Sequence, residues 1–298
     1  MELDITNFLI KYPNIEQFDD DILNPYEEDF YESVYKKKEF YDVRLEKLEK
    51  VPDNPGSLMN HQKLIARFLS SNTIYDELLL LHEMGSGKTC TAIGAVEQIR
   101  EEGKFRGALY LAKGDALVNN FINELVFKCT DGRYIPEGYN YLTELEKVHR
   151  TRKAIKDYYT TNTFETFAQK IKRYTTKEAL AKWCEDEKFN NSVIIIDEVH
   201  NLRMKAQIDE DGQKINLNVY KEFYRFLHAV KDCKILLMSG TPMKDGVDEI
   251  ASVMNLILPP DKELPTGVKF ITEFFDERND IFVLKDSKVN ILKNAFKG

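Results

Sequence analysis

The chain carries the stretch His82-Glu83-Met84-Gly85-Ser86-Gly87-Lys88-Thr89 immediately after the apolar run Glu77–Leu81. A short apolar run with polar flanks is typical of a strand covered on both faces, and residues 88–100 favour a helix. A glycine-rich turn between a strand and a helix brings backbone N–H groups and the positive end of the helix dipole close to phosphate oxygens. The stretch therefore predicts a phosphate-binding loop, in which Lys88 reaches the β- and γ-phosphates and the Thr89 hydroxyl binds magnesium.

The loop departs from the strict phosphate-loop pattern at one position. That pattern requires a glycine five residues before Gly87, and this chain has His82 there. The match is therefore to the shorter pattern Gly-x-Gly-Lys-Thr, which an ordinary turn before a helix also satisfies. We predict that the loop binds nucleotide through Gly85, Ser86, Gly87, Lys88, Thr89 and Cys90, with Cys90 as a small packing residue.

Two further apolar runs end on short polar segments. Ser192–Ile196 is followed by Asp197-Glu198-Val199-His200, and Lys234–Met238 is followed by Ser239-Gly240-Thr241-Pro242. A carboxylate at a strand end can hold magnesium, and a second carboxylate beside it can polarise an attacking water. In-line phosphoryl transfer needs little beyond such positioning and charge neutralisation. The predicted catalytic residues are therefore Lys88, Asp197 and Glu198, with Asp197 and Thr89 as metal ligands.

The last of these segments places hydroxyl groups where a doubly wound sheet binds its ligands. We predict that Ser239, Gly240 and Thr241 couple the nucleotide site to the rest of the molecule. His200 has two interpretations: it bridges the metal site to Ser239 and Thr241, or it caps the following helix. Each segment alone also fits an ordinary turn, but their order and spacing favour nucleoside triphosphate hydrolysis with motion along nucleic acid.

The three segments resemble motifs I, II and III of superfamily 2 helicases and translocases, and Glu83–Thr89 is similar to the Swi/Snf-type branch. Asn60–Leu69 resembles the glutamine-bearing helix upstream of motif I, which implies that Gln62 reads the adenine edge. Gly107–Lys113 resembles motif Ia, which contacts the nucleic-acid backbone in the family. The resemblance implies that Lys113 belongs to that interface.

The segment Thr163-Phe164-Glu165-Thr166-Phe167 matches the place where the family contacts the nucleic-acid backbone after its third strand. The hydroxyls of Thr163 and Thr166 are suitable donors to phosphate. The same threonines also fit helix-capping positions, and both interpretations stay open.

The branch of this family in large cytoplasmic DNA viruses is more similar still. It includes poxvirus nucleoside triphosphatase I, the large subunit of the early transcription factor and their giant-virus relatives. The segments that carry this likeness are Leu81–Gly85, Asp197–Asn201, Ser239–Met243, Asn255–Pro260 and Leu292–Gly298. The resemblance implies ATP and Mg²⁺ as cofactors, DNA or RNA and viral transcription proteins as partners, and the host cytoplasm or virion as location, or an intracellular soluble protein if the source is not viral.

The family places ATP between two RecA-like domains, of which the second supplies an arginine finger. No second series of strands and helices follows Ser239–Thr241 here. We therefore expect an N-terminal fragment with weak or absent turnover, because such an arginine is worth about 10³-fold or more in rate.

The expected fold class is α/β: a RecA-like doubly wound parallel sheet with a small, mostly helical N-terminal extension. Residues 1–57 form an acidic, aromatic extension, residues 58–260 the first RecA-like domain, and residues 261–298 a segment leading to the second domain. Strands are expected near residues 77–82, 106–112, 158–162, 193–197 and 234–238.

Composition and charge narrow the possible partners, location and metal sites of the protein. The net charge is −8, of which residues 1–50 contribute −7, so the predicted ATPase region is near neutral. The run Lys36-Lys37-Lys38 favours a solvated helix face. No apolar stretch is long enough to cross a membrane, and the sequence leaves the oligomeric state open. The cysteines are scattered without metal-site spacing, which argues against a disulfide scaffold or a zinc site: Cys90, Cys129, Cys184 and Cys233.

Two other functions compete with a translocase. One is a non-catalytic scaffold that binds ATP and recruits transcription machinery through its acidic aromatic extension. The other is a nucleotide kinase, which the three motifs in this order and the upstream glutamine helix disfavour. Measuring ATP hydrolysis by the full-length protein with and without DNA or RNA separates the scaffold from the translocase.

Overall fold

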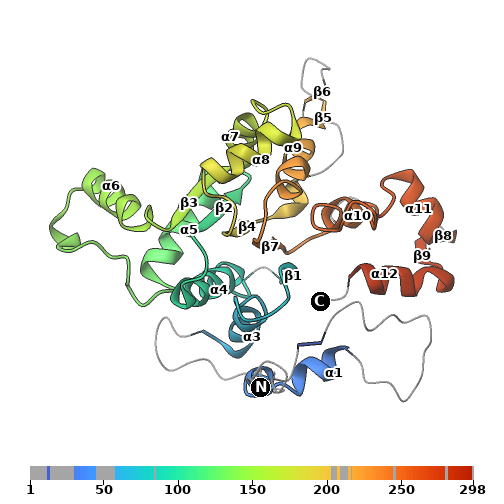
Figure 1. The fold of residues 1–298 in the computed structure, drawn as a ribbon, viewed down its shortest axis with the longest axis horizontal. Helices are drawn as coiled ribbons and strands as arrows, with labels where there is room; N and C mark the ends of the chain where they lie inside the picture. The colour runs from blue at the N-terminus through green and yellow to red at the C-terminus, as the bar shows by residue number, and fades with distance from the viewer. Residues whose placement is uncertain are drawn as a thin grey trace, which may run out of the picture.

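The structure is a computed structural model that describes residues 12–13, 30–44, 58–83, 85–202, 207–208, 214–215, 217–243, 246–278 and 281–296. Its centre is a parallel sheet of five strands in the order β1-β7-β4-β2-β3 (Figure 1). These strands match the predicted ranges and are β1 (Glu77–Leu81), β2 (Ala108–Ala112), β3 (Tyr159–Thr163), β4 (Val193–Ile196) and β7 (Lys234–Ser239).

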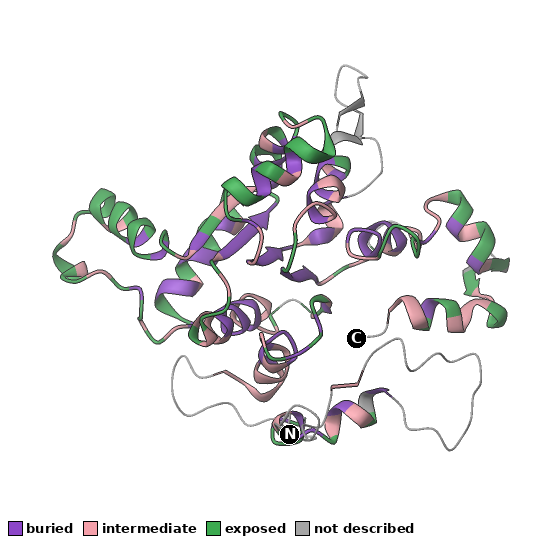
Figure 2. Cartoon of the chain, in the orientation of Figure 1, coloured by how far each residue is buried: buried purple, intermediate pink, exposed green. Residues whose placement is uncertain are grey.

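Helices cover both faces of the sheet, because the central strands are apolar on both sides. In β4, Val193 and Ile195 belong to one core cluster, and Ile194 and Ile196 belong to another. The first cluster is covered by α3 (Asn60–Phe68), α4 (Lys88–Glu102) and α5 (Asp115–Phe127). The second is covered by α7 (Phe164–Ile171), α8 (Lys177–Asp186) and α9 (Leu217–Leu227). Figure 2 shows the resulting buried sheet between more exposed helices, and the predicted doubly wound α/β class is confirmed.

The strand order brings the three predicted motifs to one place. β7 lies between β1 and β4, with Leu81 paired to Ser239 and Ile196 paired to Leu237. All three strands run in the same direction, so the segments that follow them leave the sheet at the same edge. Segments that are far apart in the sequence therefore become neighbours.

The described part of the N-terminal extension packs on the first core cluster. It contains α1 (Phe30–Tyr35) and α2 (Lys38–Tyr41), and its Phe30 and Phe40 are almost fully buried. The Lys37 ammonium lies 4.7 Å from the centre of the Tyr12 ring, and Lys37 is only 9% exposed. The expectation of a solvated lysine face was therefore wrong at Lys37, because the extension folds back and covers this side chain.

Two smaller units branch from the sheet. One contains the 3₁₀ helix η3 (Tyr139–Tyr141) and α6 (Glu144–Ile155), which project from the body of the molecule (Figure 1). Thr143 and Glu146 form a reciprocal capping box at the start of α6, as helix N-termini require. The other is an antiparallel pair, β5 (Gln207–Ile208) and β6 (Lys214–Ile215), which follows the 3₁₀ helix η4 (Val199–Asn201). Residues 209–213, which connect these two strands, lie outside the described residues.

The C-terminal elements form a third core cluster with α10 (Glu249–Met254). Phe270, Phe274 and Leu292 are buried there against Met254. The domain boundary near residue 260 stays a prediction.

None of the described helices has the length and apolar character needed to span a bilayer. The elements beyond α10 are α11 (Val268–Phe274), β8 (Phe275–Arg278), β9 (Ile281–Leu284), η5 (Asp286–Lys288) and α12 (Val289–Ala295).

The cysteines differ from the prediction. Cys90 and Cys129 form a disulfide, although 39 residues separate them in the sequence. The prediction of Cys90 as a small packing residue missed this covalent partner. One bond with two free cysteines is not the disulfide scaffold that the sequence argued against. Sequence spacing gave no sign of the bond, because it arises from the packing of α4 beside α5 on the same face of the sheet.

Candidate active site

The loop between β1 and α4 has the backbone of a phosphate cradle. Gly85 and Gly87 adopt φ angles of +84° and +80°, a left-handed conformation that glycine tolerates best. Gly87 is also the N-cap of α4, and a Cβ added there would lie 2.8 Å from Nε2 of Gln62. Gly87 is therefore favoured for its backbone conformation, and a side chain there would also have to displace the Gln62 amide. Met84 lies outside the described residues.

Lys88 points toward the segment after β4. Its Nζ donates a hydrogen bond to the His82 carbonyl at 3.2 Å and lies 3.8 Å from Oε1 of Glu198. His82 stands where the strict pattern has glycine, and it holds Lys88 through its backbone carbonyl. Because every residue has this carbonyl, the contact does not require a glycine. Burial lowers the pKa of the His82 imidazole, and the nearby His61 and Lys88 act in the same direction.

Asp197 is the first residue after β4 and is almost fully buried. One carboxylate oxygen accepts the Tyr110 hydroxyl at 2.6 Å, and the other accepts the backbone N–H of Glu198 at 2.9 Å. Burial raises the pKa of Asp197, and the carboxylate of Glu198 adds to that effect, whereas the Tyr110 hydrogen bond and Lys88 oppose it. The sequence analysis did not assign Tyr110 to the site. In the sequence, Tyr110 stands between Leu109 and Leu111 in an apolar run. That pattern predicts a core residue and gives no sign of a contact with Asp197.

Glu198 lies between two other site residues. Its carboxylate is close to Lys88, and Oε2 is 3.2 Å from Nδ1 of His200. Its φ of +51° is a left-handed conformation that non-glycine residues seldom adopt. Such backbone strain persists where the surrounding structure enforces it, often at functional sites.

His200 connects the segment after β4 to the end of β7. Its Nδ1 is 2.9 Å from Oγ of the buried Ser239, which also accepts the backbone N–H of Thr241 at 3.1 Å. The Asn201 amide nitrogen donates to the Glu198 carbonyl and lies 3.2 Å from Nε2 of His200. Because that nitrogen is a donor, Nε2 accepts and the imidazole proton belongs on Nδ1. The histidine therefore makes the bridging contact to Ser239.

Gln62 braces the phosphate loop. Its side-chain oxygen accepts the Met59 N–H at 2.9 Å, and its Nε2 donates to the Gly87 carbonyl at 3.3 Å. Both ends of the amide are thus engaged within the protein, and adenine recognition by Gln62 stays a prediction. Thr89 lies in the first turn of α4, as the predicted magnesium ligand should.

The predicted nucleic-acid residues lie at the same edge of the sheet, beside the nucleotide motifs. Lys113 is exposed directly after β2, and Thr163 ends the neighbouring β3. Thr163 accepts the Thr166 N–H at 3.3 Å and donates to the Thr166 hydroxyl, so the helix-capping contact is present. Both threonines also line a surface cavity of about 390 Å³, whose charged lining residues are Arg152, Lys156 and Asp115. The two cations and the hydroxyls are suited to a phosphate, and the Asp115 carboxylate opposes it.

Comparison with known proteins assigns the chain to a family. Residues 23–244 match the family described as "Type III restriction enzyme, res subunit" (ResIII). The chain belongs to this helicase family. Together with its viral relatives, the match places it among superfamily 2 helicases and translocases, in their viral branch.

The relatives include "Putative helicase 009L" of Frog virus 3 (isolate Goorha), which is 43% identical over 72% of this chain and 21% of its own length. "Putative helicase 087L" of Invertebrate iridescent virus 3 is 39% identical over 77% of this chain and 23% of its own. "Putative ATP-dependent RNA helicase R563" of Acanthamoeba polyphaga mimivirus is 30% identical over 73% and 35%. The chain thus spans about a fifth to a third of these relatives.

Among solved structures, the Sulfolobus solfataricus SWI2/SNF2 ATPase core in complex with dsDNA matches 76% of this chain and 40% of its own, with a TM-score of 0.45 and 18% identity. The DUF1998 helicase MrfA bound to DNA and AMPPNP matches 66% and 26%, with a TM-score of 0.36 and 17% identity. The assignment of this chain does not depend on either match.

Proposed function

We propose that this helicase-family ATPase domain binds ATP with Mg²⁺ and hydrolyses it in response to nucleic acid. The observation that carries the proposal is the convergence of three strand ends on one site. Lys88 after β1 contacts Glu198 after β4, and His200 after β4 contacts Ser239 at the end of β7. A cation, two carboxylates and the Ser239 hydroxyl, which His200 contacts, meet at one edge of the sheet. Such groups suit phosphoryl transfer.

The residues present fit a nucleotide and its metal. The left-handed glycines open a cradle of backbone N–H groups, and Lys88 supplies positive charge for the terminal phosphates. Thr89 and Asp197 are the residues that would hold Mg²⁺, which neutralises phosphate charge when bound. The hydroxyl and carboxylate oxygens of this donor set are the ligands that Mg²⁺ prefers.

Glu198 and His200 act next to this cradle. The Glu198 carboxylate is suited to orient and polarise the attacking water, and its contact with Lys88 keeps it at the phosphate end of the site. His200 passes a change in the position of Glu198 to Ser239, because its Nδ1 lies close to both side chains. We infer that Ser239, Gly240 and Thr241 transmit the nucleotide state to neighbouring parts of the full-length protein.

The substrate track is a nucleic acid in this proposal. Lys113, Thr163 and Thr166 lie at the same sheet edge as the ATP site, and Arg152 and Lys156 add positive charge to the adjoining cavity. Phosphate contacts of this kind position a strand without reading its sequence. The names of the relatives favour a viral helicase, and we propose that it acts in transcription or DNA handling.

The test is ATP hydrolysis by the full-length protein with and without DNA or RNA. We expect Lys88→Ala and Glu198→Gln each to lower nucleic-acid-stimulated kcat by at least about 10²-fold, as removal of charge-stabilising groups does elsewhere. The matched controls, Lys177→Ala and Glu178→Gln, change exposed residues of α8 and should keep full activity.

Two outcomes would contradict parts of the proposal. Full hydrolysis in both site variants would exclude the assigned mechanism. Nucleotide binding without any stimulation by DNA or RNA would favour the scaffold alternative.

A further inference from the structure

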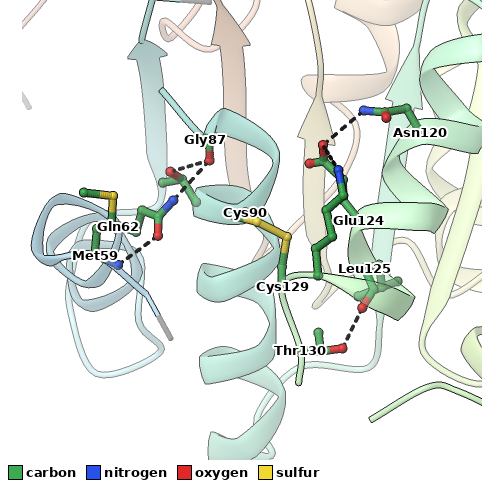
Figure 3. Close-up of a disulfide and its surroundings, with 11 residues drawn as sticks. Met59, Gln62, Gly87, Cys90, Asn120, Glu124, Leu125, Cys129 and Thr130 are labelled. Carbon is green, nitrogen blue, oxygen red and sulfur yellow. Dashed lines mark hydrogen bonds and ion pairs between the residues drawn. A yellow bond between two sulfur atoms is a disulfide. The ribbon is translucent and has the colours of Figure 1, made fainter. Parts of the chain in front are cut away.

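We propose that Cys90 and Cys129 form a reversible disulfide, the interhelix disulfide, that controls the nucleotide site through its redox state. The effect on the nucleotide rests on the proposed function, whereas the bond and its effect on stability do not. Figure 3 shows the bond between α4 and the segment after α5, on the side of α4 that faces away from Gln62.

The bond joins the phosphate loop to the end of another helix. Cys90 is the third residue of α4, two positions after Lys88, and Cys129 follows the last residue of α5 by two positions. The two Cα atoms are 5.3 Å apart, within the usual range of protein disulfides. The bond therefore needs no movement of either helix.

Both sides of the bond are fixed to their surroundings. The Cys129 N–H donates to the Glu124 carbonyl at 2.8 Å, and the Thr130 hydroxyl donates to the Leu125 carbonyl at 2.6 Å. On the other side, the Gly87 carbonyl accepts the Thr91 N–H at 2.9 Å. It also accepts the Gln62 amide at 3.3 Å (Figure 3). The disulfide thus couples a braced phosphate loop to a braced helix end.

The same helix begins beside the predicted nucleic-acid interface. α5 starts at Asp115, two residues after Lys113. When the disulfide is formed, α5 and the first turn of α4 cannot separate, so the geometry of the phosphate cradle is retained. When the disulfide is reduced, the cradle depends only on non-covalent packing between these helices.

The other two cysteines show why this pair is the reactive one. Cys184 and Cys233 are buried free thiols, and burial raises the pKa of Cys184 to about 12 and that of Cys233 above its usual value. A buried protonated thiol exchanges slowly. Cys90 is partly exposed, whereas Cys129 is 7% exposed and as buried as Cys233 at 8%. A small thiol or disulfide therefore reaches the pair at Cys90, and Cys129 reacts with the neighbouring Cys90 sulfur.

Oxidation proceeds by thiol–disulfide exchange with a small disulfide such as oxidised glutathione. The Cys90 thiolate attacks one glutathione sulfur and releases the first reduced glutathione. The Cys129 thiolate then attacks Cys90 in the mixed disulfide and releases the second. Two protein thiols are oxidised by two electrons, and one glutathione disulfide is reduced to two thiols. Reduction is the reverse reaction.

A metal site is the competing interpretation. Single donor atoms of Cys90, Glu124 and Cys129 lie within 4.8 Å of one another. Reduced thiolates and a carboxylate are zinc ligands, but the two sulfurs are bonded to each other here. The disulfide therefore carries the proposal, and zinc binding is one outcome of the test.

The experiment equilibrates the full-length protein in glutathione buffers of increasing oxidation and then measures three quantities. These are the alkylation of each cysteine by mass spectrometry, the thermal midpoint without nucleotide, and the affinity for ATP with Mg²⁺. We expect Cys90 and Cys129 to be protected together under oxidising conditions. Reduction should lower the midpoint by about 6 °C, as a bond closing a loop of this length predicts for a chain of this size. It should also weaken ATP binding about threefold, or about 0.6 kcal/mol.

Two variants separate the bond from other effects. Cys129→Ser leaves every phosphate-loop side chain in place, and it should match the reduced wild type under both conditions. The double variant Cys184→Ser, Cys233→Ser should keep the redox response, measured as the difference between its own oxidised and reduced midpoints.

The proposal is overturned if Cys90 and Cys129 are alkylated in oxidising buffer, or if the midpoint is the same in both states. Stoichiometric zinc in the reduced protein that is lost in Cys129→Ser would replace the redox role by a metal site. Failure of ATP to bind in either state would contradict the proposed function, while the alkylation and the midpoint would still test the bond.

Discussion

The Asp197 carboxylate meets two opposing requirements. It is buried at the end of a core strand beside the phosphate loop, and under the proposed function it must be ionised to bind a metal. Burial raises its pKa, and the Tyr110 hydroxyl and Lys88 partly restore the charged form. Tyr110 is thus a positioning residue: it stacks on Phe121 in the core and holds one oxygen of Asp197.

Replacing Tyr110 with phenylalanine should shift the acid limb of the pH profile of ATP hydrolysis, where activity falls with falling pH, to higher pH. Activity is lost as the pH falls through the pKa of Asp197, because the protonated acid binds metal poorly. Without the hydrogen bond that lowers it, this pKa rises further, so the loss begins at a higher pH. The measurement is the pH dependence of kcat/KM for full-length wild type and Tyr110→Phe.

The control is Tyr220→Phe, which removes a buried hydroxyl that donates to the Ser252 carbonyl, outside the residues assigned to the site. An acid limb that stays unchanged in Tyr110→Phe would show that this tyrosine does not set the charge of Asp197.

Among the elements, the strand ends and the phosphate-loop helix determine the site. The strand ranges and their polar ends were predictable, because a buried apolar run followed by Asp197 or Ser239 is typical of a strand that ends at a ligand site. The contacts of Tyr110 and Cys90 were not, since each joins residues whose proximity follows from tertiary packing. The same holds for Lys37, whose ammonium lies over the Tyr12 ring in the folded extension.

Two glycines of α4 allow a test of the phosphate loop. Gly87 and Gly103 lie at opposite ends of the helix with φ angles of +80° and +71°, so alanine has a similar backbone cost of about 1–2 kcal/mol at both. Only at Gly87 does an added Cβ meet a neighbour, Gln62, whereas the space at Gly103 is open.

We expect Gly87→Ala to weaken ATP binding by at least about tenfold, or about 1.4 kcal/mol. Gly103→Ala should lose a similar amount of thermal stability but keep its affinity. Calorimetric titration with ATP and Mg²⁺ and thermal unfolding measure the two effects. Equal affinity in both variants would mean that the loop does not form the cradle.

For the molecule as a whole, the fold class followed from the alternation of apolar strands and helical segments. The order β1-β7-β4-β2-β3 explains why the motifs meet. The sequence analysis expected a doubly wound parallel sheet but gave neither the order of its strands nor their register. Residues 130–157 are ambiguous in sequence between a loop and a Lys/Arg-rich helix, and the way α6 projects from the sheet depends on tertiary packing. The chain also covers only part of its relatives.

We therefore expect residues 1–298 alone to bind ATP but to turn it over at least about 10³-fold more slowly than the full-length protein, which would supply an arginine finger. Steady-state phosphate release from both proteins, each with saturating nucleic acid, gives the ratio. Equal rates would show that residues 1–298 contain every catalytic group.

The most direct test of the convergent site is calorimetric titration of residues 1–298 with ATP and Mg²⁺, for wild type, Lys88→Ala and Asp197→Asn. We expect one ATP per wild-type chain and at least about tenfold weaker binding in each variant, with thermal midpoints that show both variants are folded. Wild-type affinity in a folded Asp197→Asn protein would contradict the inference that the ends of β1 and β4 hold one nucleotide.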